Sequence, residues 1–349
     1  MSNKAAWLTA SKAKPLKVDV APLPKAGKGE VVIKNHAIAV NPADWKIQDS
    51  GYVVNEYPFI LGTDVAGTVE EVGEEVPDFK KGDRVIGHAL SLGTKNISHS
   101  GFQLYTACPA LAVSKIPSWM SFSQGTVLPL AINTAVVGLY PQDALGLPYP
   151  TVLDKPTPVG RTIVVIGGSS SVGSVAVQLA RASGLTVIST ASPKNHGFVK
   201  SLGASEVYAN DEPKLSSILA GKYSGTDFAG VYDAISLPNT LVLSLEISTA
   251  LSNGKPSKII TTLPVSENLA KKASSSNITF QAVFAASVPF KTPEIAKAVW
   301  HTFLSPALET GRMKAAPEAL VVGKGLEKIQ DAMEKQKAGV SAKKIVVEL

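Results

Sequence analysis

Apolar and polar positions divide the chain into a strand-rich first part and a second part in which strands and helices alternate. In the first part the apolar runs are short and separated by Gly and Pro, as at Glu30–Val40 and Asp64–Gly73. Short strands of this kind predict a small β-barrel. The second part alternates β-branched runs with helical stretches, which predicts a doubly wound parallel sheet. We therefore expect an α/β protein with one domain over residues 1–121 and another over residues 122–287.

The second region opens on a strand, a tight turn and a helix. The β-branched run Ile163–Ile166 enters the small-residue turn Gly167–Gly173, after which apolar residues recur at helical spacing. A helix over His196–Leu202 is expected to end at Gly203, which can adopt the left-handed conformation. Ile278–Phe284 is expected to be an edge strand and a candidate dimer seam. The other strands of this sheet are predicted at Leu185–Thr190, Glu206–Tyr208, Gly230–Asp233 and Lys258–Leu263.

The C-terminal part, residues 288–349, returns to two helices and one strand. The helices are predicted at Pro293–Leu304 and Leu326–Lys337, and the strand at Lys344–Leu349. Because a strand leaves its backbone groups unpaired unless it joins a sheet, we expect this last strand to complete the N-terminal barrel.

The glycine turn indicates a site for a dinucleotide. Glycines allow the backbone to approach a pyrophosphate closely, and the N-terminus of the following helix offers free N–H groups and a positive dipole. Ser170 stands where many fingerprints have their middle glycine, and serine hydroxyls can also donate to phosphate oxygens. The alternative is an ordinary turn between a strand and a helix. The candidate cofactor-binding residues are Gly167, Gly168, Ser169, Ser170, Ser171, Val172 and Gly173.

The end of the second strand favours NADPH over NADH. Enzymes that bind NAD usually carry Asp or Glu about 20 residues after the glycines, where it holds the ribose 2′-hydroxyl. The segment Ser189–Asn195 has no carboxylate and instead contains Ser192, Lys194 and Asn195. These side chains are donors suited to a 2′-phosphate, with Lys194 supplying the charge. The alternative reading of Lys194 is a surface lysine beside a proline turn.

Composition excludes several classes of protein. The 349 residues are 45% hydrophobic and 18% charged, which predicts folded domains rather than disorder. The net charge of +6 comes from scattered lysines without a dense basic stripe, so no nucleic-acid partner is expected. No uninterrupted apolar run reaches the ~18 residues of a membrane span, and no secretory signal is evident at the N-terminus. The single cysteine, Cys108, fits a reducing cytoplasm.

Three segments together resemble the medium-chain dehydrogenase/reductase superfamily over nearly the whole chain. They are Asn41–Lys46, Leu61–Gly73 and Lys81–Gly87, which precede the fingerprint turn. Within the superfamily the chain is similar to the zinc-independent branch of quinone oxidoreductases and enoyl reductases. The turn Gly167–Gly173 and the segment Thr190–Asn195 are typical of the fungal trans-acting enoyl reductases. The resemblance implies a GroES-like catalytic domain, completed by residues 288–349, and a Rossmann domain that binds NADP(H).

The resemblance also implies roles for single residues. Zinc-dependent members need a Cys near Asn41 and a His after Gly62, and this chain has Asn41 and Thr63 there, so no metal site is expected. By position in the family, Asn41, Lys46 and Tyr52 fall in the substrate region. Lys46 is the first candidate for electrophile or proton donor, with a surface lysine as the alternative. Two further residues belong to the nucleotide side. Thr134 is expected near the nicotinamide. Tyr208 is the candidate for the adenine side, although the family's tyrosine position corresponds to Asn210, two residues later.

The function implied is transfer of a hydride from NADPH to the activated C=C bond of an α,β-unsaturated carbonyl, or to a quinone, without zinc. The substrate would be a small enone, enal, quinone or enoyl thioester. Two alternatives remain open: a trans-acting enoyl reductase that serves a polyketide synthase through a carrier protein, and a non-catalytic NADPH-binding sensor. The oligomeric state is expected to be a monomer or a homodimer.

Overall fold

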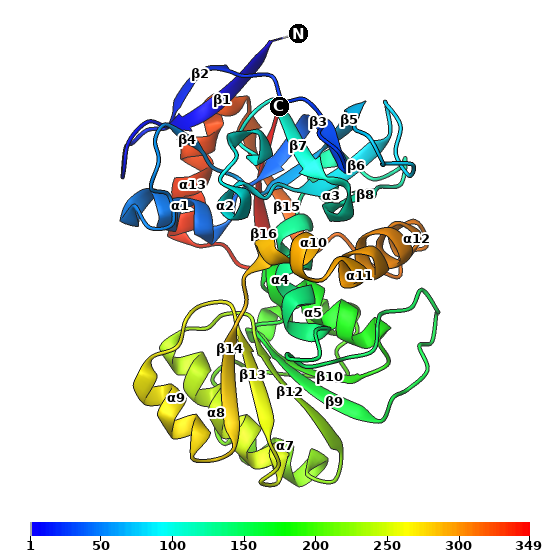
Figure 1. The fold of residues 1–349 in the computed structure, drawn as a ribbon. Helices are drawn as coiled ribbons and strands as arrows, with labels where there is room; N and C mark the ends of the chain where they lie inside the picture. Colours follow the sequence, from blue (N-terminus) through cyan, green and yellow to red (C-terminus); the bar gives the residue numbers. More distant parts are fainter. Residues whose placement is uncertain (1) are drawn as a thin grey trace. The chain divides into compact units, whose positions relative to one another are not determined.

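The computed structural model describes residues 2–349 and divides them into two compact units (Figure 1). Unit 1 contains the described residues up to Leu130, together with Pro289–Gly311 and Ala315–Leu349. Unit 2 contains Ala131–Val288 and Arg312–Lys314. The domain boundaries at residues 121 and 287 remain predictions from the sequence. The units change at Leu130 and Val288.

Unit 1 is built on two sheets. The larger has the strand order β15-β16-β3-β5-β6-β8, with β7 also paired to β3, and the smaller has the order β2-β1-β4. The strands of the larger sheet are β3 (Glu30–Ala39), β5 (Asp64–Val72), β6 (Arg84–His88), β7 (Tyr105–Pro109), β8 (Val113–Lys115), β15 (Glu318–Lys324) and β16 (Lys343–Glu348). Those of the smaller sheet are β1 (Asn3–Leu8), β2 (Lys17–Ala21) and β4 (Phe59–Ile60).

The last strand of the chain joins the first part of the chain, as the sequence predicts. Strand β16 runs antiparallel to β3, with Val346 opposite Ala39, and parallel to β15. Its apolar residues Ile345 and Val347 are fully buried in one core with Ile33 and Val65. Burial of these β-branched side chains stabilises the pairing, because each removes apolar area from water.

Helices flank the sheets of unit 1. They are α1 (Pro42–Ser50), α2 (Ser91–Thr94), α3 (Phe122–Gly125), α12 (Ser305–Glu309) and α13 (Ile329–Ala338). The helix predicted at Pro293–Leu304 is present, but most of it is π-helical rather than α-helical. The structure has α10 (Val288–Lys291), then α11 (Pro293–Ala296), and then a π-helical segment, Lys297–Leu304. Trp300 and Phe303 of this segment are buried. The apolar pattern alone does not distinguish a π-helical segment from an α-helix.

Unit 2 contains a parallel sheet of six strands in the order β11-β10-β9-β12-β13-β14. From β9 the chain moves outward through β10 to β11, returns to the centre at β12 and continues outward to β14. This reversal is the doubly wound topology of a Rossmann-type sheet. It confirms the α/β fold class, and β14 lies at the edge as expected. The strands are β9 (Arg161–Ile166), β10 (Thr186–Thr190), β11 (Glu206–Tyr208), β12 (Asp227–Asp233), β13 (Ser257–Thr261) and β14 (Ile278–Ala282).

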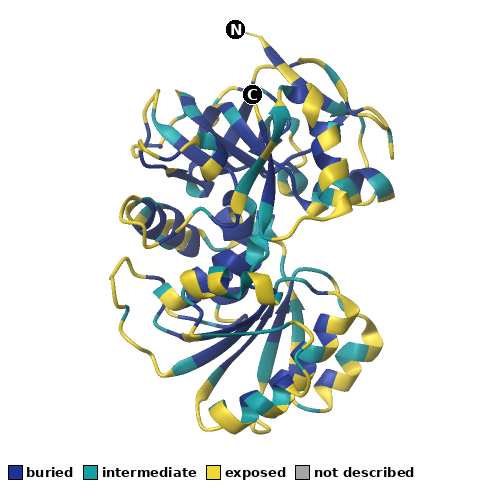
Figure 2. Ribbon diagram, turned by 180° about the vertical axis from the view of Figure 1, so that it is seen from behind, coloured by how far each residue is buried: buried dark blue, intermediate teal, exposed yellow. Residues whose placement is uncertain are grey.

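Helices cover both faces of this sheet, with α5 on one face and α7, α8 and α9 on the other (Figure 1). The strands are mostly buried, whereas the outer sides of the helices are exposed (Figure 2). The apolar run Ile163–Ile166, predicted as a strand, is buried on both faces as parallel sheets require. The helices are α4 (Pro129–Leu139), α5 (Ser171–Ala182), α6 (His196–Ser201), α7 (Leu215–Tyr223), α8 (Pro238–Ser252) and α9 (Glu267–Ser274).

One segment, Phe122–Leu139, is long and apolar enough to cross a membrane by length and composition. It is interrupted between α3 and α4, and 72% of it is buried inside the protein. Burial of this kind is what the core helices of a globular protein show. The cytoplasmic location stays a prediction.

Candidate cofactor and active site

The glycine turn lies at the carboxyl end of β9 and leads directly into α5. Gly167 has a φ of +77°, a left-handed conformation that glycine adopts at little cost. A Cβ on Gly173 would lie 2.2 Å from the carbonyl oxygen of Gly167, and one on Gly168 would lie 2.2 Å from Ser189 Oγ. Both distances are shorter than any non-bonded carbon–oxygen contact. At Gly173 the clash is with backbone, so this position requires glycine, whereas at Gly168 the Ser189 side chain would have to move.

The start of α5 presents hydroxyl and N–H donors. Ser170 caps the helix, because its Oγ accepts a hydrogen bond from the Gly173 N–H at 3.1 Å. The hydroxyl of Ser171 is buried and has no hydrogen-bond partner among the described residues. Ser169, Ser170, Ser171 and Val172 are half-buried, so this turn is accessible. An unsatisfied hydroxyl beside a helix N-terminus fits a bound pyrophosphate, which accepts hydrogen bonds from both.

The segment after β10 lies against this turn. The backbone N–H of Gly168 donates to the Thr190 carbonyl at 2.9 Å, and that of Gly167 donates to Thr190 Oγ1 at 3.1 Å. Asn195 Nδ2 lies 3.5 Å from Ser169 Oγ, which links the two segments. The structure therefore brings the two predicted parts of the cofactor site together in unit 2.

Ser192, Lys194 and Asn195 belong to a short 3₁₀ turn and its N-cap. Lys194 is exposed, and its ammonium has no hydrogen-bond or ion-pair partner within residues 2–349. An unpaired cation of this kind can bind a phosphate without first breaking an ion pair.

Tyr208, at the end of β11, lies opposite Thr190 of β10. Its hydroxyl donates to the carboxylate of Glu206 and is 3.1 Å from Lys222 Nζ. Partial burial and this carboxylate raise the pKa of the Tyr208 phenol. The ring packs against the core of the parallel sheet, with Lys222 Nζ 5.7 Å from its centre, and its polar end is held by the pair Glu206–Lys222.

In unit 1, Asn41 forms the N-cap of α1 and is buried. Its Nδ2 donates to Asp64 Oδ2 at 2.7 Å and to Thr63 Oγ1 at 3.1 Å. Its Oδ1 accepts from the ammonium of Lys344, which also lies 3.0 Å from Asp64 Oδ2. Asn41 is thus fixed by three partners at the start of the helix that carries Lys46.

Lys46 and Tyr52 are both exposed. The ammonium of Lys46 lies 5.7 Å from the centre of the Trp45 ring and has no hydrogen-bond or ion-pair partner among the residues described. Tyr52 is 76% exposed and follows Gly51, the left-handed residue that ends α1. Both side chains are free to contact a ligand from unit 1.

Thr134 belongs to unit 2 and is buried in α4. Its backbone carbonyl accepts a hydrogen bond of 2.6 Å from the Tyr232 hydroxyl. Tyr232 lies in β12, in the centre of the parallel sheet, so this bond fixes α4 against that sheet.

Sequence reasoning missed the buried charges around Asn41. Asp64 and Lys344 form an ion pair at 3.0 Å, and His88 is buried beside them. Burial lowers the pKa of His88 to about 4, so its imidazole is neutral at neutral pH. The sequence offered little signal, since Lys344 stands next to Lys343 at the start of the final strand and only the structure shows which of the two is buried. Within residues 2–349, no group of three or more His, Cys, Asp or Glu side chains is placed to hold a metal ion.

Comparison with known proteins gives close relatives over the whole chain. Residues 27–118 match the alcohol dehydrogenase GroES-like domain family. The dehydrogenase orsE of Emericella nidulans is 40% identical, covering 100% of this chain and 99% of that protein. The trans-enoyl reductase himH of Aspergillus japonicus is 41% identical, covering 99% of this chain and 97% of that protein. Among solved structures, the quinone oxidoreductase of Coxiella burnetii has the same fold, with 23% identity, a TM-score of 0.71 and 100% of both chains covered.

Proposed function

Because the chain belongs to the medium-chain dehydrogenase/reductase superfamily, in the branch that includes fungal trans-enoyl reductases and quinone oxidoreductases, we propose that it is an NADPH-dependent reductase that acts without zinc. The substrate is the activated C=C bond of an α,β-unsaturated carbonyl, or a quinone. One observation supports this most strongly: the glycine turn and the Ser192–Asn195 segment lie together and leave Lys194 unpaired.

The proposed cofactor fits the residues of unit 2. The turn from Gly167 to Gly173 and the hydroxyls of Ser169–Ser171 would hold the pyrophosphate. Ser192, Lys194 and Asn195 would hold the 2′-phosphate, and Tyr208 would border the adenosine side. The bound nicotinamide would supply the hydride, a chemistry that no side chain provides.

Unit 1 supplies the groups proposed to act on the substrate. Negative charge develops on the carbonyl oxygen when an enone is reduced, and a cation placed there lowers the barrier. Lys46 is the unpaired cation of α1, and it is our candidate for this role or for donating the proton. Asn41 holds the start of that helix, Tyr52 would line the substrate pocket, and Thr134 of unit 2 would lie near the nicotinamide.

Cofactor preference is the sharpest test. We expect wild-type protein to bind NADPH at least about tenfold more tightly than NADH, because a charge-assisted bond to the 2′-phosphate is lost with NADH. Lys194→Ala should weaken NADPH binding and leave NADH binding unchanged. Lys200→Ala, an exposed lysine in the neighbouring helix α6, is the control. Equal or tighter binding of NADH by the wild type would contradict the proposal.

Turnover with a panel of enals, enones, quinones and enoyl thioesters tests the reaction itself. Consumption of NADPH should persist after treatment with strong zinc chelators, and loss of activity under chelation would overturn the zinc-independent mechanism. Tight NADPH binding without turnover of any substrate would favour a non-catalytic sensor.

A second candidate function is a trans-acting enoyl reductase that serves a polyketide synthase. It is favoured by the relative named trans-enoyl reductase, which matches nearly the full chain. Turnover only of thioesters attached to a carrier protein, and not of the free enones, would support it.

A further inference from the structure

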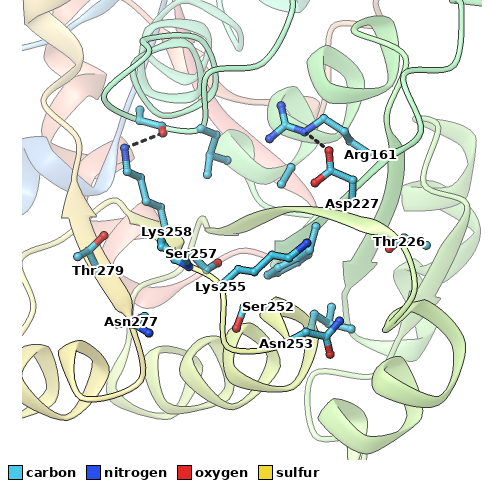
Figure 3. Close-up of a pocket in the computed structure, with 16 residues that line it drawn as sticks. Arg161, Thr226, Asp227, Ser252, Asn253, Lys255, Ser257, Lys258, Asn277 and Thr279 are labelled. Carbon is cyan, nitrogen blue, oxygen red and sulfur yellow. Dashed lines mark hydrogen bonds and ion pairs between the residues drawn. The ribbon is translucent and has the colours of Figure 1, made fainter.

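A second polar cavity lies in unit 2, at the opposite end of the sheet from the glycine turn. The turn follows the carboxyl end of β9, whereas this cavity of about 390 Å³ is lined by Arg161, Asp227 and Ser257, the first residues of β9, β12 and β13 (Figure 3). Because these strands are parallel, all their first residues gather at one edge. The cavity is therefore separate from the proposed pyrophosphate site.

Positive charge predominates in this cavity. Arg161, Lys255 and Lys258 line it, and Asp227 is the one carboxylate among its lining residues. Arg161 Nε lies 3.5 Å from Asp227 Oδ2, and the Asp227 side chain is 71% exposed, so this ion pair is long and well solvated. Such pairs contribute little and are readily exchanged for a better partner. Three cations against one carboxylate leave a net charge that favours an anion.

Lys258 is held in place without neutralisation. Its ammonium donates to the carbonyl oxygens of Asp143 at 2.5 Å and Ala144 at 3.1 Å, and Figure 3 shows the second of these contacts, because Ala144 lines the cavity. Carbonyl partners fix the ammonium but carry no full charge. Since an ammonium has three N–H donors, one remains for a ligand.

Lys255 extends across the cavity in Figure 3 and has no hydrogen-bond or ion-pair partner for its ammonium in the described part of the chain. Asn253 and Asn277, which also line the cavity, both have left-handed backbone conformations, with φ of 50° and 58°. Asn277 Nδ2 also donates to the Gly254 carbonyl at 3.3 Å. Lys255 therefore follows a turn that this hydrogen bond stabilises, and its side chain extends into the cavity.

We propose that this cavity binds a small phosphate monoester. A phosphate dianion matches two lysines and an arginine, whose guanidinium can donate two parallel hydrogen bonds to phosphate oxygens. The hydroxyls of Ser257 and Thr279 provide further donors at the same edge. Leu145 and Phe228 line the cavity as well and provide an apolar surface for the organic group of the ester.

Phenyl phosphate is the probe, titrated by calorimetry into protein already saturated with NADPH so that the cofactor site is filled. We expect saturable binding to the wild type, weakened about tenfold by Lys255→Gln, because one full charge is removed from the ligand. Asp227→Asn should strengthen binding about threefold, because it removes the single opposing carboxylate and releases Arg161. Lys271→Gln, an exposed lysine of α9 outside the cavity, is the control and should leave binding unchanged.

Both test positions are exposed, so the variants are expected to fold, and thermal unfolding checks this directly. The opposite signs expected for the two variants separate a specific site from general attraction to a basic surface. No saturable binding, equal losses with Lys255→Gln and Lys271→Gln, or weaker binding by Asp227→Asn would overturn the proposal.

Discussion

Asp44 differs more from an ordinary exposed carboxyl than any other acid in the first helix. It lies at the third position of α1, fully buried, and its Oδ2 accepts a hydrogen bond of 2.7 Å from the Asn41 N–H. Burial raises the pKa of Asp44 to about 7, and the nearby charge of Asp64 acts in the same direction. The carboxyl is therefore neutral over much of the acidic range, although its position in a capping motif suggests a carboxylate.

This pKa predicts how Asp44→Asn changes stability with pH. Between about pH 4 and 7 native Asp44 keeps a proton that the unfolded chain has lost, so the contribution of Asp44 to wild-type stability falls as pH rises through this window. The asparagine variant lacks this loss. We expect its unfolding free energy, relative to wild type, to increase by up to a few kcal/mol across the window, measured by urea denaturation.

Asp49→Asn, in the same helix, is the matched control. Hydrogen bonds from Lys14 and Lys337 hold the pKa of Asp49 below its usual value, so its effect should be small and opposite in sign. The opposing contribution of His88, whose pKa is lowered, is common to all three proteins and cancels in the differences. A pH-independent difference between Asp44→Asn and wild type would show that Asp44 is ionised in the native protein.

Lys46→Ala is expected to lower kcat by about a hundredfold while leaving the Kd for NADPH unchanged, because the cation acts on the substrate oxygen only in the transition state. Lys46→Arg separates two roles, since arginine keeps the charge but cannot give up a proton. Recovery of kcat by arginine would assign electrostatic stabilisation. Lys80→Ala, another exposed lysine of unit 1, is the control. Unchanged turnover by Lys46→Ala would remove Lys46 from the active site.

Single exposed lysines mark the limit of prediction from sequence. Lys46, Lys80, Lys194 and Lys200 are all exposed lysines, and nothing in their local pattern separates a ligand from a surface charge. The structure adds that Lys194 lies on a turn next to the glycines. The decisive information is thus a neighbour distant in the chain, which spacing does not contain.

Elements with a strong local cause are the ones that sequence predicts well. The turn between β9 and α5 requires glycine because two backbone segments approach closely. Its glycines therefore indicate the position of the turn in the sequence. Helix α1 was not predicted, although its start has a readable signal: Asn41 as N-cap, Pro42 in the first turn and Asp44 at the third position. The π-helical segment Lys297–Leu304 had none, because apolar residues at helical spacing indicate a helix without showing its hydrogen-bond pattern.

A pair of glycine substitutions tests how closely the backbone segments approach in the turn between β9 and α5. Gly173→Ala should destabilise the protein by about 1–3 kcal/mol, because its Cβ would overlap the backbone of Gly167. It should also weaken NADPH binding, since the turn must open to relieve the overlap. Gly197→Ala, in α6, meets no atom within 4 Å and should be neutral or stabilise by up to about 1 kcal/mol.

Both effects can be read from chemical denaturation, with cofactor binding followed by fluorescence. The two variants make the same chemical change, so propensity alone predicts the same sign for both. If Gly173→Ala behaved like Gly197→Ala, the turn would be looser than the structure indicates, and the proposed pyrophosphate site would lose its main support.

Across the whole molecule, the order of the parts was predictable, whereas the contacts between distant parts were not. The final strand had to find a sheet, and it pairs with β3. Its buried lysine instead depends on Asp64, which follows the segment Leu61–Thr63 at the start of β5. No periodicity connects two residues so far apart in the chain. The pair becomes visible only when β3 lies between β5 and β16 in one sheet.

Lys344 and its neighbour Lys343 allow this buried pair to be tested within one strand. The side chains of Lys344 and Asp64 are 5% and 0% exposed, so Lys344→Met would leave the Asp64 carboxylate buried without its cation. We expect a loss of about 3–5 kcal/mol in unfolding free energy. Lys343 pairs with Glu318, and both are partly exposed, so Lys343→Met should cost less than about 1 kcal/mol. Adding Asp64→Asn to Lys344→Met should recover part of the loss, because no unpaired charge then remains buried. Urea denaturation measures all three variants. If the two methionine variants had equal effects, or if the double variant showed no recovery, the Lys344–Asp64 pair would not stabilise the final strand in its sheet.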